Sequence, residues 1–374
     1  MKYKKQLCLF VFFTFFVFPQ VVNANTITAG NFICCHAVFL NIFIGILEGL
    51  LVARFCRVAK KKAIGWLLLA NYVSSFCGIF LIAVFRPIFS GTTIYNVTWI
   101  LSFYWVVFYL VTVLIEWPVI YLLFRKYQKP WKVSLKASFL AQTISYLLLL
   151  ALYGIIGNYA FLYSYNIERD LSFIKETEAI VYYISDKDGH IYKMDLNLRE
   201  PELIFDEVVL DNYYDQLYTQ PDPNGKTWDL YVLADAQRFH DLESSHHGEI
   251  QGKRILVLGN ISRVASFDIE TDSYRVQTDY IDLREEEEKE TFEIDVMAIP
   301  TRGVYVNGFN HGLMALDTPF FTWSSRNATV LPGNQVVFQL DRQICIYDRA
   351  TQKLGLLTTG RRPIVGFPTV SDIH

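Results

Sequence analysis

The stretch from Thr98 to Lys129 reads TWILSFYWVVFYLVTVLIEWPVIYLLFRKYQK, an apolar run that ends in a basic turn. At about 1.5 Å per residue, a helix over 98–124 exceeds the roughly 30 Å of hydrocarbon in a bilayer. Its single carboxylate is Glu116, and Pro118 follows two residues later. The stretch therefore predicts a transmembrane helix that carries one acid inside the membrane.

Three more long apolar segments occur in the same half of the chain, near residues 32–53, 64–85 and 137–163. Together with 98–124 they predict a bundle of four transmembrane helices within residues 25–165. Residues 1–24 have a basic start, an apolar core and a small residue at the end, which is typical of a secretory signal peptide. An uncleaved membrane anchor is the alternative for this segment.

Charge divides the chain of 374 residues into two unlike parts. Residues 1–165 hold two acidic side chains, Glu48 and Glu116, against fourteen lysines and arginines, whereas residues 166–374 hold 35 acidic and 20 basic side chains. This division excludes a single soluble domain, a disordered chain and a general nucleic-acid-binding protein.

Lysine and arginine also predict which side of the membrane each part occupies. They fill the loop 54–62 and the loop 125–136, while the loop 86–97 has one basic residue. Because positive loops stay in the cytoplasm, residues after about 165 are predicted to lie outside it. The expected protein is a multi-pass protein of the plasma or inner membrane with its C-terminal domain outside.

Polar side chains recur at helical spacing within the apolar segments and are predicted to face the bundle interior. Counting along the helices places Glu48, Asn71, Glu116 and Gln142 about 7–12 Å from the cytoplasmic ends, with Asn41 on the same helix face as Glu48. Two carboxylates in one low-dielectric layer cannot both ionise cheaply, so we expect at least one to be protonated. The layer suits a proton relay, a cation site or recognition of a polar head group; hydrogen bonding that only joins the helices is the alternative.

Residues 166–178 form a charged connector, after which the chain changes to short alternating segments separated by Gly, Asp and Pro. This pattern is typical of β-strands. One unit recurs, an alternating strand that ends in Asp and is followed by a turn. Its five copies end at Asp195, Asp235, Asp268, Asp317 and Asp348.

These copies resemble the blades of a β-propeller, in which each blade is a four-stranded meander of about 40–45 residues. The resemblance covers residues 177–370 within the predicted β domain, 179–374. It implies about five blades, with Ala179–Ile184 paired to Pro363–Val370 where the ring closes. A β-sandwich and an unclosed meander are the alternatives. A β-propeller outside the cytoplasm favours the capture of a protein, peptide or glycan over catalysis.

Possible metal ligands concentrate in one loop of the acidic half. The stretch HDLESSHHGE supplies His240, Glu243, His246 and His247, side chains that zinc or a similar metal accepts as ligands. Their spacing matches no established zinc motif, and a solvated loop is the alternative. The sequence predicts no resident cofactor.

Three hypotheses for function follow. No glycine-rich phosphate loop, GxSxG, HExxH or kinase signature is present, so no catalytic residue is identified and an enzyme is not favoured. The first hypothesis is a membrane-anchored binding or scaffold module whose β domain contacts a partner outside. The second is a subunit of an oligomeric transporter or channel that uses Glu48 and Glu116. The third is a membrane enzyme that acts on lipid or uses a metal bound in the loop 240–249.

Overall fold

The computed structural model describes residues 39–89, 91–156, 165–207, 209, 216–221, 227–240, 248–261, 263–264, 281–282, 316–318, 322–323 and 325–367. The chain divides into two compact units. The helical unit comprises residues 1–159 and 317–322, and the β unit comprises residues 160–316 and 323–374. The predicted signal peptide, 1–24, lies outside the described residues.

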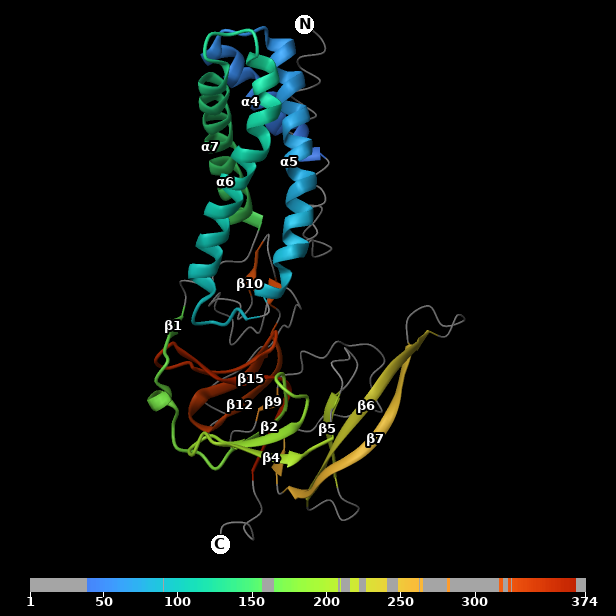
Figure 1. The fold of residues 1–374 in the computed structure, drawn as a ribbon. Helices are drawn as coiled ribbons and strands as arrows, with labels where there is room; N and C mark the ends of the chain where they lie inside the picture. The colour runs from blue at the N-terminus through green and yellow to red at the C-terminus, as the bar shows by residue number, and fades with distance from the viewer. Residues whose placement is uncertain are drawn as a thin grey trace, which may run out of the picture. The chain divides into compact units, whose positions relative to one another are not determined.

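Within the described residues, the helical unit contains four α-helices. They are α4 (Asn41–Cys56), α5 (Lys60–Phe89), α6 (Val97–Phe124) and α7 (Pro130–Ile156). Consecutive helices pack together, and α7 also packs against α4, so the four form a bundle (Figure 1). Local sequence sets the turns. The residue after α4, Arg57, has a left-handed φ of 53°, and Pro130 begins α7, a position where the missing N–H costs little.

The prediction of four transmembrane helices is wrong. Among the described residues, only α6 and the Pro130–Gly154 part of α7 are long and apolar enough to cross a membrane. The described helix α4 has 16 residues and extends about 24 Å, and residues 32–38 of the predicted first segment lie outside the described residues. The predicted segment 98–124 differs from α6 by one residue at its start, whereas the predicted segment 137–163 begins seven residues later than α7.

The two candidate spans have an apolar exterior. Only 22% of the apolar window in α6 and 33% of that in α7 is buried inside the protein. Large side chains such as Trp99, Phe103, Leu114 and Leu147 are exposed. The core helices of soluble proteins bury their apolar side chains instead. By length, composition and exposure, α6 and α7 therefore fit an apolar surrounding such as lipid.

The β unit is built on one curled, mainly antiparallel sheet that forms a half-barrel (Figure 1). Along its main path the strand order is β4-β3-β2-β15-β14-β13-β12-β9, and β1 and β8 pair with β15. The strands of this sheet are β1 (Asn166–Ile167), β2 (Ile180–Ser185), β3 (Ile191–Asp195), β4 (Pro201–Phe205), β8 (Arg263–Val264), β9 (Ile281–Asp282), β12 (Ser325–Leu331), β13 (Gln335–Leu340), β14 (Gln343–Asp348) and β15 (Lys353–Phe367).

Two smaller sheets and two short 3-10 helices complete the described elements. Strands β5 (Gln216–Pro221), β6 (Trp228–His240) and β7 (Gly248–Ile261) form an antiparallel sheet, and β10 (Leu316–Asp317) pairs with β11 (Thr322–Trp323). The 3-10 helices are η2 (Leu171–Phe173) and η3 (Pro332–Asn334).

Strand β15 makes the large sheet continuous. Its first part pairs with β14, and its last part pairs with β2 through Ile364↔Tyr182 and Val365↔Val181. The part that pairs with β2 begins at Gly360, and its register is irregular between Arg361 and Ile364, a feature that bends a strand. Ala179–Ile184 thus does lie beside the C-terminal strand, but inside one sheet.

The prediction of a five-bladed β-propeller is wrong, since the β unit is a curled half-barrel, and it is not the alternative β-sandwich either. Blades of a propeller are separate sheets, whereas the expected first and last blades, β2–β4 and β13–β15, are hydrogen-bonded to each other. The expected turn at Asp235 is absent because β6 continues through it, and Asp268 lies outside the described residues. The alternation of apolar and polar residues and the turn residues specify each hairpin locally. They do not specify which hairpins pair with each other in one sheet.

Both faces of β2 are covered, which explains why this strand is almost wholly buried. Tyr182 and Ile184 belong to a buried cluster shared with β5, β6 and β7. Their neighbours Val181 and Tyr183 point to the opposite face and pack with side chains of β3, β13, β14 and β15. The period of two along a strand therefore produces two apolar layers here.

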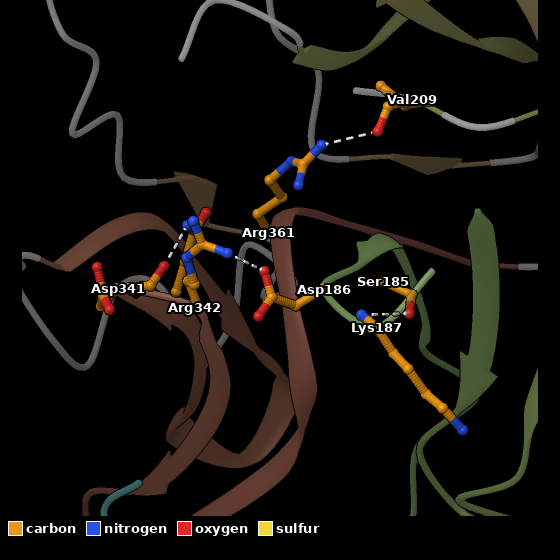
Figure 2. A network of polar contacts seen from close by, with 8 residues as sticks. Ser185, Asp186, Lys187, Val209, Asp341, Arg342 and Arg361 are labelled. Carbon is orange, nitrogen blue, oxygen red and sulfur yellow. Dashed lines mark hydrogen bonds and ion pairs between the residues drawn. The ribbon is translucent and has the colours of Figure 1, made fainter. Parts of the chain in front are cut away.

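Two polar contacts join segments that are distant in the chain at the large sheet (Figure 2). Arg342, after β13, forms an ion pair with Asp186, after β2, with 2.7 Å between Nη1 and Oδ1. Buried Arg361 on β15 donates from Nη2 to the carbonyl oxygen of Val209 over 3.0 Å. Because the first pair is part-exposed, it contributes at most about 1 kcal/mol.

Candidate functional site

Polar side chains from all four helices meet inside the helical unit. Helical periodicity brings them there, because residues three, four or seven apart share a face. We call the following six residues the carboxylate cluster: Glu48 on α4, Asn71 and Ser74 on α5, Glu116 on α6, and Gln142 and Ser145 on α7. All six are buried, and both carboxylates have no exposed surface.

Close packing of α4 on α5 positions the first carboxylate. A Cβ atom added to Gly49 would lie 2.5 Å from the Cα of Ile64, and one added to Gly45 would lie 3.0 Å from the Cα of Leu68. Glycine alone allows the two backbones to approach this far. The spacing Gly45-x-x-x-Gly49 thus serves packing within one chain, and it places Glu48 opposite α5.

Glu48 accepts hydrogen bonds from two other helices. Asn71 donates from Nδ2 to Glu48 Oε2. Ser145 donates from Oγ to Glu48 Oε1 over 2.5 Å. The amide of Asn71 also donates to the carbonyl oxygen of Leu67 over 3.1 Å, so both of its N–H groups are used.

Gln142 links the two carboxylates. Its Nε2 lies 3.3 Å from Glu48 Oε1 and 2.5 Å from Glu116 Oε2. Ser74 completes the surroundings of the second carboxylate by donating from Oγ to Glu116 Oε1 over 2.7 Å. Both acids of residues 1–165 therefore lie within reach of one amide group.

The charge balance of the cluster determines its chemistry. Within the described residues, every hydrogen bond to Glu48 and Glu116 comes from a neutral amide or hydroxyl group, and no lysine, arginine or histidine pairs with either. Burying two unpaired negative charges costs several kcal/mol each. A proton held on one carboxyl group removes much of that cost. Since the amide N–H groups point at the carboxylates, the site suits a proton better than a metal ion.

Asn41 lies apart from the carboxylate cluster. It is buried on the same face of α4 as Glu48, but its Nδ2 donates to Ser75 Oγ over 2.5 Å. Seven residues separate Asn41 from Glu48, which is about 10 Å along a helix. The structure therefore brings together four of the five residues of the predicted layer and places the fifth two turns away.

Ser74 and Ser145 contact the carboxylates directly, although the predicted layer did not include them. Each follows an amide by three residues, Ser74 after Asn71 and Ser145 after Gln142. Positions three apart share a helix face. The repeated spacing of amide and serine was the signal that could have added both hydroxyl groups to the layer.

The predicted metal-binding loop falls largely outside the described residues. His240 is the last residue of β6, whereas Glu243, His246 and His247 are not described. The part of the chain that the structure describes holds no group of three or more His, Cys, Asp or Glu side chains arranged for a metal ion.

Comparisons with known proteins add no relative. No protein-family model, curated protein or solved structure matches the chain.

Proposed function

We propose that this chain is a membrane-anchored protein whose helical unit binds a proton between Glu48 and Glu116, as a subunit of an oligomeric transporter or channel. The observation that carries the proposal is the position of Gln142, which donates to both buried carboxylates. Intramembrane carboxylates without basic partners are typical of proton relays. Four helices do not readily enclose a path alone, so we infer an oligomer.

The apolar exterior of α6 and α7 supports the membrane anchor. Their connection carries Arg125, Lys126 and Lys129, and basic connections stay in the cytoplasm. A chain that crosses outward after this connection carries the β unit outside the cytoplasm. Membrane crossing by α6 and α7 would place Glu116 within the apolar layer, near its cytoplasmic side.

Proton flux in reconstituted vesicles tests the proposal. Full-length protein would be inserted into liposomes that contain a pH-sensitive dye, and a potassium diffusion potential would drive proton entry. We expect the wild type to acidify the interior, and Glu48→Gln, Glu116→Gln and the double variant to fall to the rate of empty liposomes. Glutamine keeps the shape and hydrogen-bonding capacity of the side chain but cannot exchange a proton at neutral pH.

Glu202→Gln in the β unit is the matched control, because Glu202 is exposed and forms an ion pair with Lys193 at the surface. It should conduct like the wild type. Wild-type flux no higher than that of empty liposomes contradicts the proposal, and so does wild-type flux in the folded double variant. In both cases the cluster would serve only to join the helices.

The β unit supports a second candidate function, the membrane-tethered binding module. Exposed Arg254 on β7 stacks over Tyr231, with its Cζ 4.1 Å from the ring centroid, and lies 5.7 Å from the ring of Tyr218. It also donates to Gln220. Arginine and tyrosine dominate the energetics of many protein and peptide interfaces. This function needs no proton exchange, so the liposome assay separates the two candidates.

A further inference from the structure

We propose that one end of the helical unit binds the headgroups of anionic phospholipids. This end, here named the basic end, comprises the α4–α5 and α6–α7 connections and the helix turns beside them. Its ten basic residues are Arg54, Arg57, Lys60, Lys61, Lys62, Arg125, Lys126, Lys129, Lys132 and Lys136. The inference rests on the membrane anchor in the proposed function, and it adds the class of lipid that the anchor binds.

Packing shows that both connections lie at the same end of the bundle. One buried apolar cluster contains Val52 and Ala53 from the end of α4, together with Ala63 from the start of α5. The same cluster contains Phe124 from the end of α6 and Ala137 from the start of α7. The two connections are therefore neighbours, and Figure 1 shows them together.

All ten basic side chains of the basic end are exposed. No acidic residue lies in 49–115 or in 117–165, so none occurs in either connection. The nearest acids along the chain, Glu48 and Glu116, are buried and bonded to neutral groups. Among the described residues, no carboxylate pairs with these cations. The concentration of positive charge therefore remains available to phosphate groups.

Aromatic side chains beside the cations favour a lipid over a soluble polyanion. Trp131 is 50% exposed, and the Nζ of Lys132 lies 5.1 Å from the centroid of its ring. Tyr127 and Phe55 are also exposed at this end. Tryptophan and tyrosine concentrate at the level of lipid headgroups, where one part of the ring is apolar and the other is wet.

The apolar surface continues from the basic end along the candidate spans. Leu122, near the end of α6, and Phe139, in the third turn of α7, are both exposed. A ligand that meets cations at the connections and apolar side chains about 10 Å further along a helix needs a charged head and an acyl chain. An anionic phospholipid has both, whereas a nucleic acid or an acidic protein has only the charge.

Lipid titration of the purified full-length protein tests the inference. Phosphatidylglycerol or phosphatidylcholine would be added to protein in neutral detergent, and bound lipid would be counted by native mass spectrometry. We expect phosphatidylglycerol to bind at least about tenfold more tightly, since each lysine near an anionic headgroup adds a roughly fivefold preference. The preference should shrink in high salt, which screens exposed charges.

Two variants at the basic end show whether the lipid preference depends on positive charge or on the lysine side chains themselves. Lys129→Gln/Lys132→Gln should lose most of the preference, and Lys129→Arg/Lys132→Arg should keep it. The matched control is Lys187→Gln/Lys253→Gln, which removes two exposed lysines of the β unit and should bind like the wild type.

Three results overturn the inference: equal affinity of the wild type for the two lipids, an unchanged preference in the glutamine variant, or displacement of phosphatidylglycerol by an equal concentration of inorganic phosphate. The last result would indicate a site for a free anion. Extraction of membranes with alkaline carbonate distinguishes these results from failure of the anchor. Protein that stays in the membrane but does not discriminate between lipids contradicts only this inference, whereas protein released by carbonate contradicts the membrane anchor itself.

Discussion

At the scale of single residues, Gln142 is buried and donates to both carboxylates of the carboxylate cluster. A buried carboxylate that loses a donor keeps the full cost of its desolvation. Gln142 Nε2 serves two such groups, Glu48 and Glu116. Its removal therefore affects two buried acids, while the loss of Ser74 or Ser145 affects one.

We predict that Gln142→Leu destabilises the protein by about 1–3 kcal/mol. Thermal unfolding of the detergent-solubilised protein measures the effect. Gln128→Leu, in the exposed α6–α7 connection, is the control, and its stability should stay within about 0.5 kcal/mol of the wild type.

A double-variant cycle shows whether the cost comes from the carboxylates. If Gln142→Leu acts by leaving Oε2 of Glu116 without its donor, adding Glu116→Gln should cost less than the sum of the two separate changes. Additive costs would show that Gln142 stabilises the bundle by packing alone, which would weaken the proposed proton site.

At the scale of secondary-structure elements, glycine distribution controls helix contacts. Gly45 and Gly49 face α5 with no room for a Cβ atom, whereas Gly65 and Gly78 on α5 have no other group within 4 Å of that position. Glycine therefore stabilises the helical unit at one kind of position and destabilises it at the other. Glycine is required where backbones touch, and it weakens the helix where they do not.

Gly49→Ala should destabilise the bundle by about 1–3 kcal/mol, because the new methyl group would overlap the backbone of Ile64. Gly65→Ala should stabilise it by up to about 1 kcal/mol through helix propensity. Thermal unfolding of both variants under one detergent condition checks the pair. A harmless Gly49→Ala would mean that α4 does not approach α5 as closely as described.

The Asp turns of the β unit show a local motif that the sequence identified correctly in two places. Asp195 accepts hydrogen bonds from the backbone N–H groups of Asn197 and Leu198, and Asp348 accepts them from those of Ala350 and Thr351. Each aspartate is the last residue of its strand, and its side chain stabilises the turn that follows. The two hairpins are alike locally, yet they belong to one sheet.

At the scale of the whole molecule, the proposed topology places the basic end and the β unit on opposite sides of a membrane. Site-specific labelling of intact cells with a membrane-impermeant maleimide tests this. In a background that keeps only Cys345, Lys187→Cys in the β unit should react at once, and Lys61→Cys at the basic end should react only after permeabilisation. Both lysines are exposed. Equal labelling of both sites in intact cells would contradict the topology.

Cys345 serves as an internal control in that experiment. It is fully buried in β14, and burial raises the pKa of its thiol. The thiolate is the reactive form, so native Cys345 should stay unlabelled near pH 8 and react only when denaturant opens the sheet. Because the folded state holds this proton more tightly, its contribution to stability is present below about pH 8.5 and falls as the pH rises above that value.

Much about this protein follows from its sequence alone. The separation of basic and acidic halves, the apolar length of α6 and α7 and the polar residues at helical spacing are local properties, and the structure places Glu48, Asn71, Glu116 and Gln142 together. Helical periodicity alone is enough to place residues on a common face.

Only the tertiary structure decided how distant segments pair. The hydrogen bonds from Gln142 to both carboxylates depend on the packing of α7 beside α4 and α6. The half-barrel depends on β15, which pairs with both β14 and β2, although β14 and β2 are more than 150 residues apart in the chain. A strand edge offers the same N–H and C=O groups to any partner. Its partner is therefore chosen by which apolar faces can be buried together, and this depends on the whole fold.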